Sequence, residues 1–149
     1  MIQYALKGLT ADELSFKVNP VRATPDSKFE IKPMFSRQIR QANENPKINI
    51  VILECKIEST DEAPKPFNLH VRFVGIFEVE NMNTDEDKRI FAVNATETMF
   101  PYLRAAVTNL TADALINPLT LPVISGATLF PEDRGPNQYT LNFDPTVIN

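Results

Sequence analysis

Apolar and polar residues alternate through most of the first half of the chain, which is the period of strands with one buried face. The alternation runs through 14–18, resumes over 29–40, and continues in two longer stretches at 48–59 and 67–80. Short polar turns separate the last three stretches. Because parallel neighbours require long crossover connections, this arrangement predicts a four-stranded antiparallel sheet.

The predicted third and fourth strands each have one consistently apolar face. The apolar positions are Val51, Leu53, Cys55 and Ile57 in the third strand, and Phe67, Leu69, Val71, Phe73, Phe77 and Val79 in the fourth. At the start of the third strand Ile48, Ile50 and Ile52 occupy the opposite face, so this end of the sheet is expected to be covered on both sides. Pro33 lacks a backbone N–H, and the second strand is therefore expected to be an edge strand or to be bulged.

The second half of the chain changes to the period of a helix. Thr84 followed by three carboxylates is typical of a helix N-terminus and predicts a short helix as far as Val93. A longer helix is predicted to begin near Met99, with Pro101 in its first turn, and to stop before Pro118. One stripe carries its apolar residues, which are Phe100, Leu103, Val107, Leu110 and Ala114. The fold class is therefore α+β, a four-stranded antiparallel sheet followed by a long helix.

The length of 149 residues fits a single domain over 1–149, with a proline-containing tail at 131–149. A chain of this size buries about 68–70% of its unfolded surface and needs neither a disulfide nor a metal to fold. One amphipathic helix covers only part of the apolar face of a four-stranded sheet. The remainder of that face is expected to contact a second subunit, a substrate or the tail.

Charge and composition disfavour several classes of function. A net charge of -4 gives no electrostatic reason to expect nucleic acid or an anionic membrane as a partner. No apolar run approaches the ~20 residues that span a bilayer, and the N-terminus does not have the pattern of a signal peptide. A lone cysteine, Cys55, excludes an internal disulfide, which is typical of a reducing compartment. A cytoplasmic location is therefore expected.

Candidate catalytic groups are few. His70, the only histidine, is interpreted as a solvated surface residue rather than a catalytic one, because no nucleophile motif accompanies it. Cys55 is interpreted as a buried, inert thiol rather than a redox group. The acidic run at 85–87 is interpreted as part of a helix N-terminus rather than a metal site. With no glycine-rich phosphate loop and no metal-ligand spacing, the sequence predicts no enzyme, no cofactor and no metal.

An apolar segment follows the predicted long helix. It comprises Leu119, Leu121, Val123, Ile124, Leu129 and Phe130. Prolines at 118, 122 and 131 prevent one long helix here, so these side chains are expected to pack irregularly. Two interpretations remain open: the side chains complete the core, or some of them line an open groove that binds a partner.

Several motifs occur in a characteristic order. The segment 73–79 contains Gly-Ile-Phe at the end of the fourth predicted strand, and 99–104 reads Met-Phe-Pro-Tyr-Leu-Arg. The segment 119–123 reads Leu-Thr-Leu-Pro-Val, and Leu-Phe follows at 129–130. Together they resemble the SecB family of protein-export chaperones, in which similar motifs end the fourth strand, begin the long helix and follow it. The resemblance covers roughly 70–130 well, and the strand half only by pattern.

The resemblance implies a cytosolic holdase that binds unfolded polypeptides without ATP, and a homotetramer built as a dimer of dimers. Low sequence selectivity is expected, because burial of apolar surface is non-directional. The subunit interface is predicted to use the long helix, where Ala105 and Ala106 allow close approach, together with an edge strand. Client contacts are predicted at Val21, Leu121, Val123, Ile124, Leu129 and Phe130.

The chain also departs from the family pattern. The connection at 21–27 carries no aromatic residue, Pro131 cuts short the second helix, and the tail at 137–149 has no recognisable motif for docking on the export motor SecA. SecA docking is therefore not predicted. The departures instead predict a divergent family member that serves a few clients, such as an antitoxin. One alternative is a non-catalytic structural or assembly protein that binds one folded partner. A small hydrolase or ligand-binding enzyme is disfavoured by the lone histidine.

Overall fold

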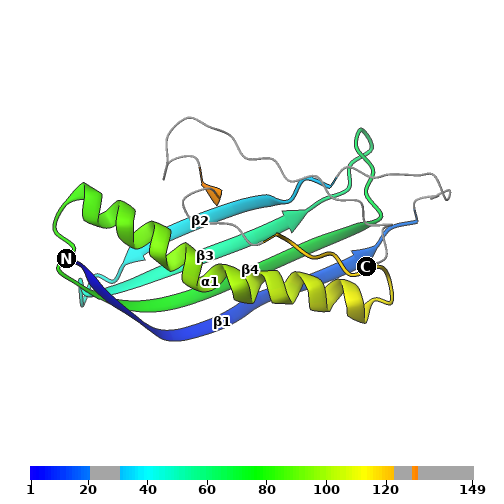
Figure 1. The fold of residues 1–149 in the computed structure, drawn as a ribbon. Coiled ribbons are helices and arrows are strands. Elements are labelled where there is room, and N and C mark those ends of the chain that lie inside the picture. The colour runs from blue at the N-terminus through cyan, green and yellow to red at the C-terminus, as the bar shows by residue number, and fades with distance from the viewer. Residues whose placement is uncertain (21–30, 123–128, 131–149) are drawn as a thin grey trace.

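The structure is a computed structural model that describes residues 1–20, 31–122 and 129–130. These residues form four strands followed by one long helix (Figure 1). The elements are β1 (Gln3–Val18), β2 (Met34–Gln41), β3 (Ile48–Ile57), β4 (Phe67–Glu80) and α1 (Asp85–Asp113). The strands form a single antiparallel sheet in the order β1-β4-β3-β2. The predicted α+β class and antiparallel sheet are confirmed.

Strand β1 is much longer than the stretch at 14–18 that alternation alone predicts. Two register shifts, between Leu6 and Gly8 and between Ala11 and Glu13, mark bulges in its pairing with β4. Each bulge adds one residue and restores the phase of the apolar positions. The residues of β1 that pair with the helix-facing residues of β4 are therefore Tyr4, Leu6, Leu9, Ala11, Leu14, Phe16 and Val18.

Strand β2 lies at the opposite edge of the sheet. It begins at Met34, directly after Pro33, so the missing N–H of proline lies outside the β2–β3 ladder. The edge position predicted for this strand is confirmed. The predicted start at Phe29 falls outside the described residues, and Ile31 is fully buried.

Helix α1 is one continuous helix of 29 residues, so the prediction of two separate helices was wrong. Pro101 consequently lies in its interior rather than in a first turn. The polar run at 94–98 interrupts the apolar pattern, but the hydroxyls of Thr96 and Thr98 donate to carbonyls one turn earlier, at 2.7 and 2.8 Å. These polar groups are satisfied within the helix, which therefore continues. It ends at cap residue Ala114, after which Leu115 has a φ of 62°.

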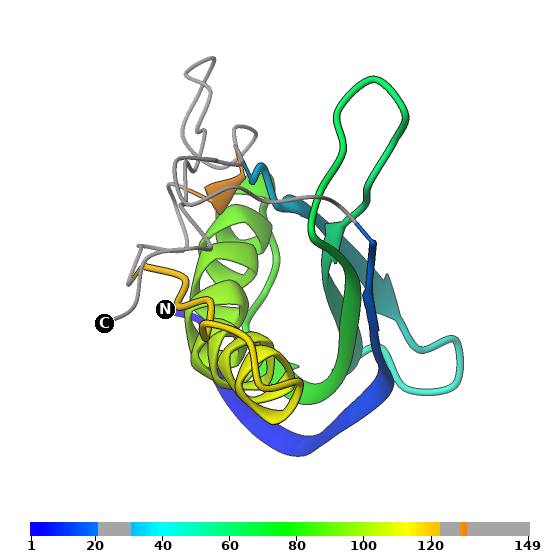
Figure 2. The ribbon, with the colours of Figure 1, turned by 90° about the vertical axis from the view of Figure 1, so that its right-hand side faces the viewer.

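The core lies between α1 and the concave face of the sheet, which curves around the helix (Figure 2). Gly75 allows a close approach of β4 to α1, because a Cβ there would lie 2.9 Å from Met99 Sδ and 3.0 Å from Phe77 Cε2. Phe77 also packs edge-on against Phe91 at 5.5 Å between ring centroids. On the opposite face Ile52 is buried, whereas Ile48 and Ile50 are only half-buried, so the predicted cover of this end on both sides holds in part.

The N-terminus of α1 forms a capping box. The Thr84 hydroxyl accepts a hydrogen bond from the Asp87 N–H at 3.0 Å, and Asp87 Oδ2 accepts from the N–H groups of Asn83 and Thr84 at 3.0 and 3.1 Å. The bonds that Asp87 accepts lower its pKa. The prediction that the acidic run begins a helix is confirmed, although that helix is α1 itself.

The capping box makes stability depend on pH. A carboxyl whose pKa is lowered by folding stabilises the folded state fully above its unfolded value of about 3.9, and this contribution is lost as pH falls through the folded pKa. Asp87→Asn is therefore expected to be less stable than the wild type at neutral pH, and the difference should shrink as the pH falls below about 4. Urea unfolding across this range measures the difference; a gap that stays constant with pH would contradict it.

Candidate functional site

Charged side chains cluster on the outer face of the sheet, away from α1. His70 Nε2 lies 2.6 Å from Glu54 Oε2, and His70 Nδ1 lies 3.7 Å from Glu13 Oε1. Arg72 pairs with Asp12 at 2.9 Å and lies 3.8 Å from Glu54. His70 is thus half-buried between two carboxylates, on the surface but not freely solvated.

Ser15 lies opposite His70 in the register of β1 and β4, which brings a hydroxyl and an imidazole into one neighbourhood. A nucleophilic relay requires the hydroxyl to donate its proton to the imidazole. Here the Ser15 hydroxyl donates instead to Glu13 Oε2, at 2.5 Å. The arrangement therefore does not activate Ser15 as a nucleophile.

Cys55 is fully buried, and burial raises the pKa of its thiol to about 12. Because the thiolate is the reactive form, the side chain is inert near neutral pH, as the sequence predicted. Within 1–20, 31–122 and 129–130, no three or more His, Cys, Asp or Glu side chains group together in a way that could hold a metal ion. Across the same ranges, no helix is both long and apolar enough to cross a membrane.

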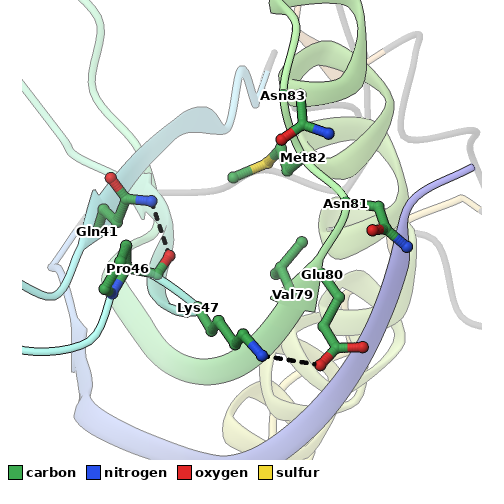
Figure 3. Close-up of a pocket in the computed structure, with 8 residues that line it drawn as sticks. All are labelled: Gln41, Pro46, Lys47, Val79, Glu80, Asn81, Met82 and Asn83. Carbon is green, nitrogen blue, oxygen red and sulfur yellow. Dashed lines mark hydrogen bonds and ion pairs between the residues drawn. The ribbon is translucent and has the colours of Figure 1, made fainter.

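A cavity of about 440 Å³ lies where β4 leads into α1 (Figure 3). Lys47 Nζ and Glu80 Oε1 form an ion pair across it at 3.2 Å, and Gln41 Nε2 donates to the Pro46 carbonyl at 2.7 Å. Its lining residues are Gln41, Pro46, Lys47, Val79, Glu80, Asn81, Met82 and Asn83. These side chains include no serine, threonine, cysteine or histidine, and the amine of Lys47 is held in the ion pair with Glu80.

The segment after α1 packs back along the helix. The carbonyl of Leu119 accepts from the Thr108 hydroxyl at 3.0 Å, and the carbonyl of Leu121 accepts from Arg104 Nε. The Leu119 N–H donates to the Thr111 hydroxyl at 2.8 Å. Leu121 is consequently fully buried against α1.

The other predicted client contacts fall into two groups. Leu129 and Phe130 are 6% and 5% exposed and belong to the core cluster of the single chain. Val21, Val123 and Ile124 lie outside the described residues. The structure therefore brings Leu121, Leu129 and Phe130 into one core.

Arg37 on β2 connects the strand, the helix and Phe130. Its Nη1 donates to the Thr96 hydroxyl at 2.9 Å and to the Ala92 carbonyl at 3.4 Å. Its guanidinium carbon also lies 4.4 Å from the centroid of the Phe130 ring, the geometry of a cation–π contact. Sequence reasoning missed this residue, because a charged residue in an alternating strand is usually assigned to the solvent face.

Apolar side chains remain exposed along β1. Leu14 and Val18 are 51% and 53% exposed, although both lie on the helix-facing side of the sheet. Tyr102, on α1, is also exposed. We name Leu14, Phe16 and Val18 the β1 flank. The full length of β1 could have been recognised from its apolar residues, which are spaced two and three positions apart from Tyr4 onward. A search for strict alternation does not detect this spacing.

Comparison with known proteins identifies the family of the chain. The sequence profile of the family described as "Preprotein translocase subunit SecB" matches residues 5–135. The chain belongs to the SecB family. The predicted resemblance is confirmed, and membership places the chain among chaperones of protein export.

Individual relatives agree with this assignment. The protein-export protein SecB of Anaplasma phagocytophilum is 25% identical over 137 residues, covering 90% of this chain and 81% of that protein. An uncharacterized protein of Methanocaldococcus jannaschii is 32% identical over 103 residues, covering 68% of this chain and 66% of that protein. The alignment thus spans just under two thirds of the archaeal protein.

A solved SecB-like structure shares the fold. It is the SecB-like chaperone of Mycobacterium tuberculosis in complex with a ChAD peptide from the HigA1 antitoxin. The TM-score is 0.67 at 19% identity, with coverage of 82% of this chain and 91% of that one. Of the SecB-like motifs, Gly-Ile-Phe lies near the end of β4, as the resemblance implied, whereas Phe-Pro-Tyr lies in the interior of α1 rather than at its start.

Proposed function

We propose that this SecB-family chain is an ATP-independent holdase that binds non-native polypeptides in the cytoplasm, as a homotetramer built as a dimer of dimers. The observation that carries the proposal is apolar surface left exposed at both edges of the sheet beside a single covering helix, at Leu14 and Val18 on β1 and at Ile39 on β2. Large apolar side chains left exposed on a helix-facing sheet surface indicate a surface that is completed by another polypeptide. Family membership supports a chaperone role for that surface.

The edge of β1 supports assembly. β1 is 16 residues long and pairs on one side with β4, and within the described part of the chain no strand pairs with its other side. A long unpaired edge is a template for pairing with another chain. We propose that two copies meet through this edge and that dimers associate through α1, where Ala105 and Ala106 are small enough for close approach.

Client contacts are proposed on the other side of α1, toward β2. Phe35 is half-buried, and Ile39 is partly exposed, on the helix-facing side of β2. Leu121, Leu129 and Phe130 would form the apolar floor of this surface, and Val21, Val123 and Ile124 remain proposed contacts. An extended client would bury its apolar side chains here at about 25 cal/mol per Å².

The clients are proposed to be few. The solved SecB-like relative holds a peptide from an antitoxin, which supports an extended polypeptide as the ligand. The outer face of the sheet mixes Glu13, Glu54, His70 and Arg72, so it does not present the strongly acidic surface expected to dock the export motor. We therefore propose that the chain serves few clients, either in protein export or as a dedicated chaperone of the toxin–antitoxin type.

Suppression of aggregation tests the proposal. A denatured model protein diluted into buffer with a stoichiometric amount of the tetramer, and no nucleotide, is expected to scatter less light than without it. Light scattering combined with size exclusion gives the mass of the assembly in the same samples. No protection across several denatured clients, together with one folded protein that copurifies stoichiometrically, would instead assign an assembly role.

A further inference from the structure

A second cavity, of about 300 Å³, lies beside the one in Figure 3 and shares Gln41 and Met82 with it. It is lined by Ile39, Gln41, Asn49, Met82, Lys88 and Phe91. Ile39, Met82 and Phe91 make most of its wall apolar, and Lys88 stands at the start of α1. In Figure 3 the Met82 side chain points toward Gln41.

Asn49 is the unusual residue of this cavity. It lies on the helix-facing side of β3, opposite Phe77 and Gln41, in a row whose next positions are apolar. The side chain is 2% exposed. Among the buried side-chain nitrogens and oxygens of the described residues, its Nδ2 is the one without a hydrogen-bond partner. A buried unpaired donor is costly, and its presence in the wall of a cavity indicates a ligand that supplies the acceptor.

We infer that this cavity binds a tyrosine side chain of a bound polypeptide, with the phenol oxygen accepting a hydrogen bond from Asn49 Nδ2. The apolar wall of the cavity favours a ligand that is mostly apolar. The unpaired Nδ2 of Asn49 requires an oxygen at the end of that ligand. Among the large apolar side chains, phenylalanine and leucine carry no acceptor, tryptophan is a donor only, and the thioether sulfur of methionine is only a weak acceptor. Tyrosine satisfies both requirements.

The wall also suits a ring. Phe91 presents an aromatic face or edge, and Met82 presents a thioether, both of which interact favourably with aromatic groups. Lys88 adds a cation that can approach the π face or a backbone carbonyl of the ligand. Because the ligand is a polypeptide, the inference rests in part on the proposed function.

Methyl NMR of the full chain tests the site. N-acetyl-tyrosinamide, and a short peptide with one central tyrosine, are titrated while the methyl signals of Ile39 and Met82 are followed. Both are expected to give saturable shifts and to bind about five-fold more tightly than their phenylalanine counterparts, as one added hydrogen bond predicts. Equal affinity for the tyrosine and phenylalanine probes, or no shift at these methyls, would overturn the inference.

Two variants locate the effect. Asn49→Leu removes the donor without leaving a polar group unpaired, so it should fold and should bind the tyrosine and phenylalanine probes equally. Ile39→Ser keeps the donor and should weaken both probes alike. Asn109→Leu, on the exposed surface of α1, is the matched control and should keep the tyrosine preference. A preference that survives in Asn49→Leu, with circular dichroism showing a folded chain, would refute the assigned donor.

The two tyrosine probes and the aggregation assay distinguish the possible outcomes. Binding of free N-acetyl-tyrosinamide without binding of the peptide would replace the polypeptide with a small phenol and overturn the inference as stated. If the chain does not suppress aggregation but the tyrosine probes still shift the methyl signals, the result would count against the holdase proposal and would still support this site.

Discussion

Phe77→Ala is expected to lower the free energy of unfolding by about 3–5 kcal/mol. Phe77 is fully buried on the helix-facing side of β4, and its ring contacts Phe91 at 5.5 Å and Tyr4 at 6.3 Å between centroids. Truncation removes the transfer free energy of the ring and leaves a cavity where β1, β4 and α1 meet. Urea denaturation at fixed protein concentration measures the change.

The neighbouring residue supplies the control. Ile76 lies on the opposite face of the same strand and is 41% exposed. Ile76→Ala is therefore expected to cost less than about 1.5 kcal/mol, because a partly exposed side chain leaves no sealed cavity. Similar losses for the two variants would show that the core does not lie between the sheet and α1.

Leu129→Ser combined with Phe130→Ser is expected to weaken client binding at least about ten-fold. Under the proposed function these side chains form the floor of the client surface. Because both are already buried in the single chain, the loss is expected to arise from deformation of the apolar surface above them, which the client buries. Arg37 would also lose the ring that it contacts at 4.4 Å. Fluorescence anisotropy with a labelled unfolded client measures the affinity.

Both residues are nearly buried in the single chain, so folding must be monitored alongside affinity. The mass of the assembly should be unchanged, because the proposed interfaces lie on β1 and α1. Leu115→Ser provides a matched apolar-to-polar control at a residue that is 92% exposed beyond the end of α1. If the double variant is folded and binds clients as tightly as the control, the client site lies elsewhere.

In the sheet, the alternation of apolar and polar residues predicted β4 well and β1 only in part. The apolar row of β4 was predicted from Phe67 to Val79, and the strand spans Phe67–Glu80. In β1 the apolar spacing alternates between two and three residues, because two bulges each insert one residue into the pairing with β4. A rule with a strict period of two therefore recognised only the end of that strand.

In the helix, local signals predicted a break that the structure does not have. The sequence analysis began a second helix near Met99 because that start places Pro101 in a first turn, where its missing N–H costs little. Packing of Ala95 and Met99 into the core and back-bonding by Thr96 and Thr98 keep α1 continuous. Tertiary contacts outweighed the local preference.

The sequence by itself determined the strand order along the chain, the amphipathic faces, the helix N-terminus and the SecB resemblance, because each depends on residues close together in the chain. Only the tertiary structure decided which apolar residues are sealed and which stay exposed. It placed Leu121 in the core, left Leu14 and Val18 open, drew Arg37 to Phe130, and left Asn49 without a partner in a cavity wall. Burial depends on how one helix covers a curved sheet, and no local pattern contains that information.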